Sequence, residues 1–244
     1  MTARLISQPV VHMSAAEAAG SDDILAPLIN AAPGHPYVIA QLGQSLDGRI
    51  ATPTGASRWI NRDCALDHVH RLRANVDAVV VGIGTVVADD PLLTVRRVAG
   101  RHPARVIIDP NGRMDAHARV LLDDGVRCIV VRGESGAVRP GLEQIVVGRC
   151  GALLDPNEIV TALFNAGLKK ILVEGGASTI SAFIDAGAVD RLHVLVAPII
   201  LGSGTPGLSL KAIAGLDEAR RPPTTVHVLD DGDVLFDCDL TDCD

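Results

Sequence analysis

Aromatic residues are scarce in this sequence, at 2% of 244 residues with a single tryptophan. A core built on stacked rings is therefore excluded. Hydrophobic residues still reach 48% against 21% charged residues, which predicts a packed globular protein rather than a disordered chain. The apolar content is mostly Val, Ile, Leu and Ala, the composition of an α/β protein with a parallel-rich sheet.

Other shortages exclude whole classes of protein. There is no Cys-x-x-Cys pair and the cysteine count, 5, is odd, so a disulfide framework or a zinc site is not expected. A net charge of −7 argues against sequence-independent binding of nucleic acid. The start of the sequence, MTARLISQPVVHMS, has no apolar core long enough for a signal peptide, and no run reaches the length of a membrane span. These absences predict a cytoplasmic protein with reduced thiols, no metal, no nucleic acid and no membrane.

The chain divides at a cluster of breakers, Ala32–Pro36. Residues 1–36 form a predicted N-terminal arm in which Ala15–Ala19 and Asp22–Asn30 could each make a short helix, the second capped by Ser21 or Asp22. We expect this arm to pack on the surface or on a partner subunit. Residues 37–244 form the predicted main domain.

Alternating strands and helices fill the main domain. Strands are predicted at Tyr37–Leu42, Ala78–Val81, Arg105–Ile108, Cys128–Val131, Gln144–Val147, Lys170–Val173 and Arg191–Ala197, with a closing hairpin of Thr225–Leu229 and Asp233–Leu240. Helices are predicted at Asn61–Val76, Thr85–Ala88, Asp155–Gly167 and Ala177–Ala186, with Asn61 and Asp155 as N-caps. The fold class is therefore a single α/β domain of about eight or nine strands: a mixed, mostly parallel central sheet with helices on both faces and a C-terminal β-hairpin.

Two joints in the predicted domain place glycines between a strand and a helix. The first is Gly82-Ile83-Gly84 before Thr85, and the second is Gly175-Gly176 before Ala177-Ser178-Thr179. Free backbone N–H groups at such a joint suit a phosphate. The first joint alone could equally be a tight turn with solvated charges behind it. Two joints at one sheet edge favour a dinucleotide site.

Several side chains near these joints allow two interpretations. Trp59 is either a core plug or a flat surface for a heterocycle. Arg132-Gly133-Glu134-Ser135 could seat a ribose 2′-phosphate or form only a polar turn. Glu174 at a strand end requires a hydrogen-bond donor if buried, such as a ligand hydroxyl or amine. Arg73 could reach the same sheet edge. His68 and His70 point to different faces of their helix, which argues against a shared metal.

Five separated motifs resemble one known family. They are Ser45-Leu46-Asp47-Gly48-Arg49, Arg71-Leu72-Arg73-Ala74, the stretch Gly84–Arg96, Leu172-Val173-Glu174-Gly175-Gly176, and Gly187-Ala188-Val189-Asp190-Arg191 before Ala197-Pro198. Together they are similar to the reductase domain of riboflavin biosynthesis, which is related in fold to dihydrofolate reductase. The resemblance runs from about Tyr37 to the C-terminus.

This resemblance implies an NADPH-dependent reductase that converts a ribosylamino-pyrimidine 5′-phosphate to its ribitylamino form, by hydride transfer to ribose C1′. The residues that the resemblance implies at the cofactor are Gly43, Trp59, Thr85, and Gly176 with the residues to about Ala182, including Ala177, Ser178 and Thr179. The two glycine joints add Gly82, Gly84 and Gly175 to these candidates. Those implied at the substrate are Ser57, Arg73, Asp89, Leu93, Arg96 and Glu174, with Asp89 and Glu174 as the catalytic candidates. Two guanidinium groups, Arg73 and Arg96, suit the substrate phosphate.

Departures from the family pattern refine these expectations. Bifunctional bacterial members carry a zinc deaminase signature that this sequence lacks, so we expect a stand-alone reductase. Those members tend to have lysine where Gln41 stands, which leaves the deaminated and the diamino pyrimidine both open as substrate. The resemblance also implies a homodimer. A pterin or folate-like substrate, or a non-catalytic nucleotide-binding module, remain alternatives on the same scaffold.

Overall fold

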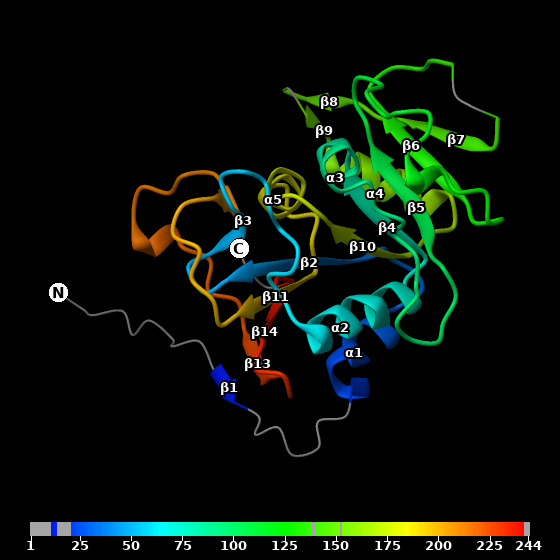
Figure 1. Cartoon of the computed structure of the whole chain (residues 1–244). Coiled ribbons are helices and arrows are strands. Elements are labelled where there is room, and N and C mark those ends of the chain that lie inside the picture. Colours follow the sequence, from blue (N-terminus) through cyan, green and yellow to red (C-terminus); the bar gives the residue numbers. More distant parts are fainter. Residues whose placement is uncertain (1–10, 14–20, 138–139, 152, 242–244) are drawn as a thin grey trace.

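The computed structural model describes residues 11–13, 21–137, 140–151 and 153–241 (Figure 1). Its centre is a ten-stranded sheet in the order β1-β13-β14-β11-β2-β10-β4-β5-β6-β7. The strands of the parallel part are β2 (Tyr37–Ser45), β4 (Ala78–Gly82), β5 (Ala104–Ile108), β6 (Cys128–Arg132), β7 (Leu142–Val146), β10 (Lys170–Glu174) and β11 (Arg191–Ala197).

An antiparallel hairpin completes one side of the sheet. β14 (Val234–Asp239) pairs antiparallel with β11, and β13 (Thr224–Val228) pairs antiparallel with β14. β1 (Val11–Met13) then lies parallel to β13 at the edge. This confirms the mixed, mostly parallel sheet and the C-terminal hairpin. The predicted strand count was too low because it lacked β1 and the short pairs outside the main sheet.

Those short pairs are β3 (Arg49–Ala51) with β12 (Thr205–Pro206), and β8 (Arg149–Cys150) with β9 (Leu153–Leu154). Single 3₁₀ turns lie at η1 (Arg119–Leu121) and η2 (Leu216–Glu218).

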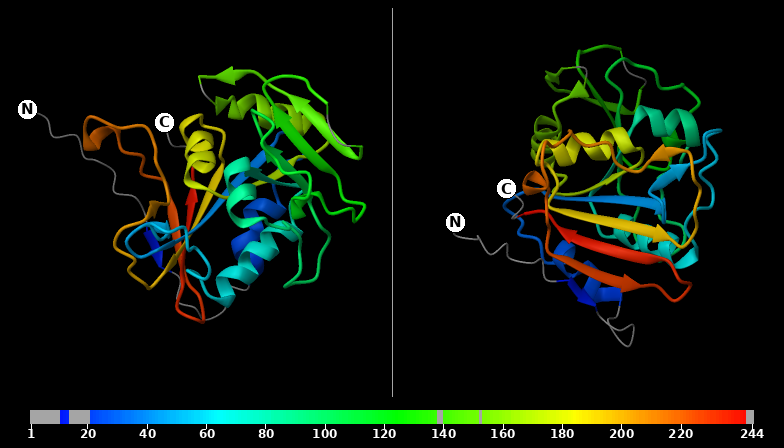
Figure 2. Two further views of the ribbon diagram at one scale, coloured as in Figure 1. Left: turned by 45° about the horizontal axis from the view of Figure 1, so that its top comes forward. Right: turned by 90° about the vertical axis from the view of Figure 1, so that its left-hand side faces the viewer.

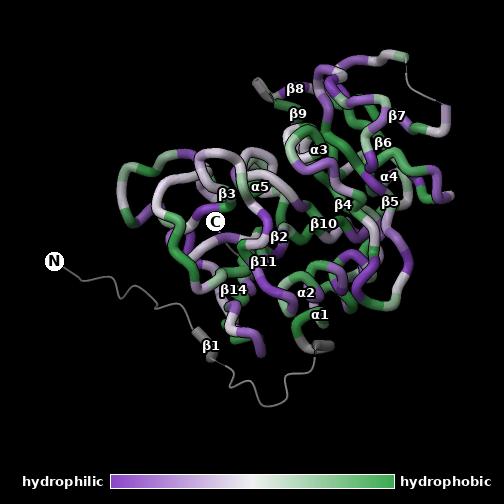
Figure 3. Tube along the Cα trace, in the orientation of Figure 1, coloured by the Kyte–Doolittle hydropathy of each residue, from purple (hydrophilic) through white to green (hydrophobic). Residues whose placement is uncertain are grey.

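Helices cover both faces of the sheet (Figures 1 and 2). α4 (Pro156–Asn165) and α5 (Ala177–Asp185) bury side chains such as Leu163 and Phe183 against one face. α1 (Ser21–Ile29), α2 (Asp63–Ala74) and α3 (Ile83–Asp89) cover the other face. The central strands are apolar on both sides, which Figure 3 shows as hydrophobic colouring along β4 and β10. That pattern is the reason these strands read as continuous Val, Ile and Leu runs.

α1, the described helix of the predicted N-terminal arm, packs into the core of the domain. Leu25 and Leu28 of α1 are 4% and 1% exposed and belong to the same buried cluster as Ile39 and Leu72. The helix predicted at Ala15–Ala19 lies outside the described residues.

Helix caps show where local sequence decides and where tertiary contacts do. Asp155 caps α4 as predicted, accepting a hydrogen bond from the Asn157 N–H at 2.9 Å. The prediction for Asn61 was wrong, because the N-cap of α2 is Arg62, without a side-chain cap of its own. Carboxylates from the β13–β14 turn serve instead.

In that turn, Asp233 accepts from the Arg62 N–H at 2.8 Å and Asp231 from the Cys64 N–H at 2.8 Å. Negative charge at a helix N-terminus is favourable. Asn61 instead donates from Nδ2 to Asp233 at 3.0 Å and to the Leu195 carbonyl at 3.3 Å.

A buried polar chain fastens α2 to the hairpin. His68 Nε2 lies 2.9 Å from His193 Nδ1, and His193 Nε2 lies 3.1 Å from Asp237 Oδ1. Burial opposes ionisation of Asp237, but hydrogen bonds from His193 and Arg191 outweigh it and lower its pKa to about 2. Since the carboxylate only accepts, His193 donates from Nε2 to Asp237. The pKa of His68 is lowered well below 6.5, first by burial and then by His193 and Arg71.

This lowered pKa predicts a loss of stability in mild acid. The folded state resists protonation of His68 while the unfolded chain accepts it near pH 6.5, so the free energy of unfolding falls as pH drops below that value. Each proton taken up on unfolding contributes about 1.4 kcal/mol per pH unit. Urea unfolding of wild type and His68→Gln between pH 8 and pH 5 checks this. Gln keeps a hydrogen-bond donor but does not titrate. The free energy of unfolding of His68→Gln should therefore fall less steeply with decreasing pH than that of wild type, by the equivalent of about one proton. Equal pH dependences for the two proteins would contradict the assignment.

Candidate active site

The two strand–glycine–helix joints lie side by side at one edge of the sheet. β4 and β10 are adjacent parallel strands, so Gly82 and Gly175 follow strand ends that meet at the same edge. The backbone N–H of Gly176 donates to Thr85 Oγ1 at 3.0 Å, which joins the second joint directly to the first. The prediction that both open at a common edge is confirmed.

Each joint needs its glycine because of a threonine from the other. A Cβ on Gly82 would stand 2.3 Å from Thr179 Oγ1, and a Cβ on Gly175 would stand 2.7 Å from Thr85 Oγ1. Gly175 also has φ +114°, a conformation that side chains disfavour. The joints therefore interlock, and close approach of backbone and threonine hydroxyl depends on the missing side chains.

A cavity of about 670 Å³ opens above these joints. The predicted site residues that line it are Gly43, Ser57, Gly82, Gly84, Thr85, Asp89, Gly175, Gly176, Ser178 and Thr179. They come from β2, the loop after β3, and both joints. The structure thus assembles most of the predicted cofactor residues around one space.

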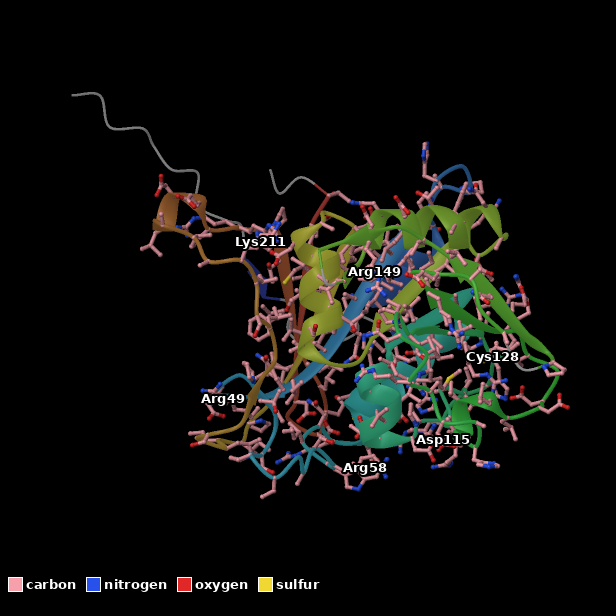
Figure 4. The ribbon with its side chains drawn as sticks, turned by 90° about the horizontal axis from the view of Figure 1, so that it is seen from above. Arg49, Arg58, Asp115, Cys128, Arg149 and Lys211 are labelled. Atoms are coloured by element: carbon pink, nitrogen blue, oxygen red, sulfur yellow. The ribbon has the colours of Figure 1, made fainter. Side chains whose placement is uncertain are left out.

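The remaining predicted residues lie outside the lining of this cavity. They are Trp59, Arg73, Leu93, Arg96, Glu174 and Ala177. Trp59 is 72% exposed, so the interpretation as a core plug was wrong. Its neighbour Arg58 donates from Nη2 to the Asp89 carbonyl at 2.8 Å, which ties this loop to the end of α3 (Figure 4).

Arg73 and Glu174 form a buried, two-pronged ion pair next to the cavity. Nε and Nη2 of Arg73 donate to the two carboxylate oxygens at 2.7 and 2.6 Å, and each side chain is 9% exposed. Burial opposes the charge on Arg73, but Glu174 outweighs it and raises the arginine pKa. Arg73 is therefore the hydrogen-bond donor that a buried Glu174 was expected to require. Arg73 Nη1 also donates to the Thr94 carbonyl at 3.1 Å.

Positive charge gathers beyond this pair on the segment after α3. The pKa of Arg96 is lowered by burial and by the neighbouring charges of Arg73, Arg119 and Arg97. Within the same segment Leu93 is buried with φ +55°, a left-handed conformation that is costly for a side chain with a Cβ. Such backbone strain is common where structure is held for function. The positive charge of Arg96, which these neighbouring arginines disfavour, would be stabilised by a bound anion.

Sequence reasoning missed several lining residues from neighbouring strands. Asn111 and Arg113 after β5 line the cavity, as does Gln41 of β2, which the sequence connects with the choice of substrate but does not place in the site. Asn111 and Arg113 closely follow the predicted strand Arg105–Ile108. The available signal was topological: β5 is parallel to β4 with its end at the same edge, so its loop faces the same space.

Arginines cluster where that loop borders the cavity. Arg149, labelled in Figure 4, donates from Nη2 to the Pro110 carbonyl at 3.2 Å and to Asn111 Oδ1 at 3.1 Å. Arg132 lies beside Gly112, and its buried Nε has no hydrogen-bond partner among the described residues. The polar turn predicted at Arg132–Ser135 therefore begins beside a cationic end of the site.

Comparison with known proteins shows which family the chain belongs to. A sequence profile of the RibD C-terminal domain matches residues 36–216. The chain belongs to the RibD C-terminal domain family. Within the described residues, no group of three or more His, Cys, Asp or Glu could hold a metal ion. No helix in the described part of the chain has the length and apolarity to cross a membrane.

Relatives of this RibD-type domain differ in length. The chain is 37% identical over 191 residues to the 2,5-diamino-6-ribosylamino-4(3H)-pyrimidinone 5′-phosphate reductase of Methanothermobacter thermautotrophicus, covering 75% of this chain and 87% of that protein. It is 34% identical to the riboflavin biosynthesis protein RibD of Bacillus amyloliquefaciens, covering 78% of this chain but only 53% of that protein.

Solved structures agree on the fold. A deaminase/5-amino-6-(5-phosphoribosylamino)uracil reductase from Thermotoga maritima superposes with a TM-score of 0.72 at 27% identity, covering 89% of this chain and 59% of that one. The riboflavin biosynthesis reductase Rib7 of Saccharomyces cerevisiae gives a TM-score of 0.69 over 98% of its chain, at an identity of 21% that shows the fold alone. The predicted reductase-type α/β fold is confirmed.

The interlocked joints predict a specific pattern of stability. Gly82→Ala places a methyl against Thr179 Oγ1 and should lower the free energy of unfolding by about 1–3 kcal/mol, the usual cost of overpacking. Adding Thr179→Ala should restore most of that loss. Gly84→Ala is the matched control, since nothing lies within 4 Å of a Cβ there. Chemical denaturation of the four proteins checks this, and equal effects of Gly82→Ala and Gly84→Ala would contradict the interlock.

Proposed function

We propose that this protein uses NADPH to reduce a ribosylamino-pyrimidine 5′-phosphate to the ribitylamino compound in riboflavin biosynthesis. The observation that carries the proposal is the single cavity onto which both glycine joints open, flanked by the Arg73–Glu174 pair. Kinship supports it, because the archaeal relative that this chain covers almost fully is named as such a reductase.

The residues at the joints fit a dinucleotide. The first N–H groups of a helix have no intrahelical partner, and α5 starts directly after Gly175–Gly176, so its first turn would take the pyrophosphate. Ala177, Ser178 and Thr179 belong to that turn, while Gly43, Gly82, Gly84 and Thr85 border the rest of the cavity and exposed Trp59 would cover a heterocycle. Bound NADPH supplies the hydride, and the protein holds its partner carbon in contact with it.

The arginines around Asn111 give a reason to prefer NADPH over NADH. Arg113 lines the cavity and Arg149 is fixed on Asn111, so two guanidinium groups border one end of the space. Guanidinium groups bind phosphate through charge-assisted hydrogen bonds. We assign this end to the ribose 2′-phosphate, with the Arg132 side chain behind it.

This assignment predicts a change in cofactor selectivity. Arg113→Gln should lower the ratio of kcat/KM for NADPH over that for NADH by about tenfold, the size of one lost charge-assisted bond, because NADH has no 2′-phosphate to lose. Arg220→Gln, an exposed arginine elsewhere, should leave the ratio unchanged. Steady-state kinetics with both cofactors decides it. An equal loss of kcat/KM with NADPH and with NADH would contradict the assignment of Arg113 to the ribose 2′-phosphate.

On the substrate side, Arg96 is the guanidinium available for the 5′-phosphate, since three nitrogens of Arg73 already bind Glu174 and Thr94. Arg73 would then act by fixing Glu174 at the cavity margin. Ser57 lines the cavity and would border the sugar, whereas Leu93 is buried outside the lining and would act only by shaping the segment that carries Arg96. Opening of the sugar to an imine-like form at C1′ takes a proton from the exocyclic nitrogen and gives one to the ring oxygen. Asp89, which lines the cavity, is the group placed to carry this proton, and Glu174, whose two oxygens Arg73 holds, orients the sugar hydroxyls.

Gln41 is suited to contact the pyrimidine. It lines the cavity and is 7% exposed. A buried amide needs partners, and it offers both donors and an acceptor. The diamino pyrimidine is the form named for two archaeal relatives, and we propose it as the substrate here.

A second copy of this chain is the partner we propose. β11, β14 and β13 carry Val194, Phe236 and Val226 in register on one face, and Phe236 is 37% exposed. Self-association would bury this apolar row. The cytoplasmic location that the cysteine content indicates stays a prediction.

The reaction is tested by NADPH oxidation with three substrates compared: the diamino pyrimidine phosphate, its deaminated form and dihydrofolate. We expect the diamino compound to give the highest kcat/KM. Arg96→Ala should weaken its binding by about 2–4 kcal/mol, the cost of removing one charge from a desolvated pair, and leave the NADPH Kd unchanged. Turnover of dihydrofolate alone would contradict the proposal, and equal weakening for both ligands would contradict the role of Arg96.

A further inference from the structure

The segment Thr94–Arg97 lies along one face of α2. Residues 63, 67, 70 and 73 follow one another at steps of three and four, so their side chains share a face of that helix. All four contact this segment. It belongs to no helix or strand, and its backbone groups are instead held by side chains.

The contacts run along the helix in order. At one end, Arg73 Nη1 donates to the Thr94 carbonyl at 3.1 Å. In the middle, the Arg96 N–H donates to His70 Nδ1 at 3.1 Å. At the other end, the Arg97 guanidinium pairs with Asp63 and Asp67 at 2.8 and 2.5 Å.

A second histidine holds the same segment from its other side. The Val95 N–H donates to His102 Nδ1 at 3.2 Å. Two consecutive backbone donors therefore end on imidazole nitrogens. A ring nitrogen that accepts from an N–H carries no proton of its own, so this conformation of the segment requires both rings to be unprotonated at Nδ1.

The surroundings of His70 keep it neutral. It is 3% exposed, and the charged groups that face it are Arg73 and Asp67 on its own helix and Arg96 and Arg97 on the segment. Burial and the three arginines lower its pKa to about 4, against the weaker opposite effect of Asp67.

We propose that His70 is a positioning residue for substrate binding: its neutral imidazole fixes the backbone of Arg96 and so aims the Arg96 guanidinium at the substrate phosphate. This inference rests on the proposed function of Arg96. His70 touches neither cofactor nor substrate in it. His70 acts through the peptide N–H of Arg96 alone. The other contacts from α2 hold the rest of the segment along the helix.

The test compares His70→Asn, which offers an oxygen near the position of Nδ1 without titrating, with His70→Leu, which removes the acceptor. His35→Asn is the matched control, because His35 is exposed and lies beside the opposite end of the strands, near Lys170. Hydrogen–deuterium exchange of the peptide containing residues 93–97 reports the clamp directly. KM, kcat and the NADPH Kd report its consequence.

His70→Leu should speed exchange in residues 93–97 and raise the KM for the pyrimidine phosphate on the order of tenfold, as one backbone donor is left unpaired. Its kcat at saturation and its NADPH Kd should stay near wild type. His70→Asn should restore both exchange and KM. Between pH 6 and pH 4 the wild-type KM should rise relative to that of His70→Asn, since only the imidazole takes up a proton.

Two results would overturn the inference. Unchanged exchange in a folded His70→Leu protein would show that the imidazole does not hold the segment. Faster exchange with an unchanged KM would show that the clamp does not serve substrate binding. If wild type turned over no pyrimidine phosphate, the proposed function would fail, and the exchange data would still decide whether His70 holds Arg96.

Discussion

The buried pair of Arg73 and Glu174 is the interaction on which this site depends. Glu174 ends β10 directly before the second glycine joint, and Arg73 belongs to the last turn of α2. Removing two charges from water is expensive, and an isolated pair of this kind adds little to stability over apolar residues of equal size. Its value here is geometric. Two parallel bonds fix the orientation of α2 on the sheet, and the remaining guanidinium nitrogen holds the Thr94 carbonyl.

From this pair the site extends in two directions. Toward the cavity, Gly175 and Gly176 approach Thr85 so closely that the two joints behave as one unit. Toward the surface, the same face of α2 carries His70 and Asp67 to the segment of Arg96 and Arg97. One helix therefore sets the distance between the space assigned to the cofactor and the guanidinium assigned to the substrate phosphate. A third connection, from His68 through His193 to Asp237, fastens that helix to the far hairpin.

Much of this could be predicted from the sequence because it follows from local rules. Short runs of Val, Ile and Leu bounded by glycine or Asp-Pro placed the main strands within about three residues at each end, and Asp155-Pro156 placed the start of α4. The parallel order of β4 and β10 then brings their joints together. What escaped prediction depends on contacts distant in sequence. Asp233 replaces Asn61 at the start of α2 across 171 residues of chain. No local pattern distinguishes Arg113 from any other arginine in a turn, and the donor for Glu174 lies 101 residues away.

We propose that one cavity holds a dinucleotide on the interlocked joints and presents a phosphorylated sugar to it beside Arg96. The most direct measurement is a crystal structure of the complex with NADP⁺ and the ribitylamino-pyrimidine phosphate. We expect the pyrophosphate over Gly175–Gly176 at the start of α5, the 2′-phosphate at Arg113, and the substrate phosphate on Arg96, with the nicotinamide C4 in contact with C1′. A nucleotide bound away from both glycine joints, or a substrate phosphate far from Arg96, would contradict it.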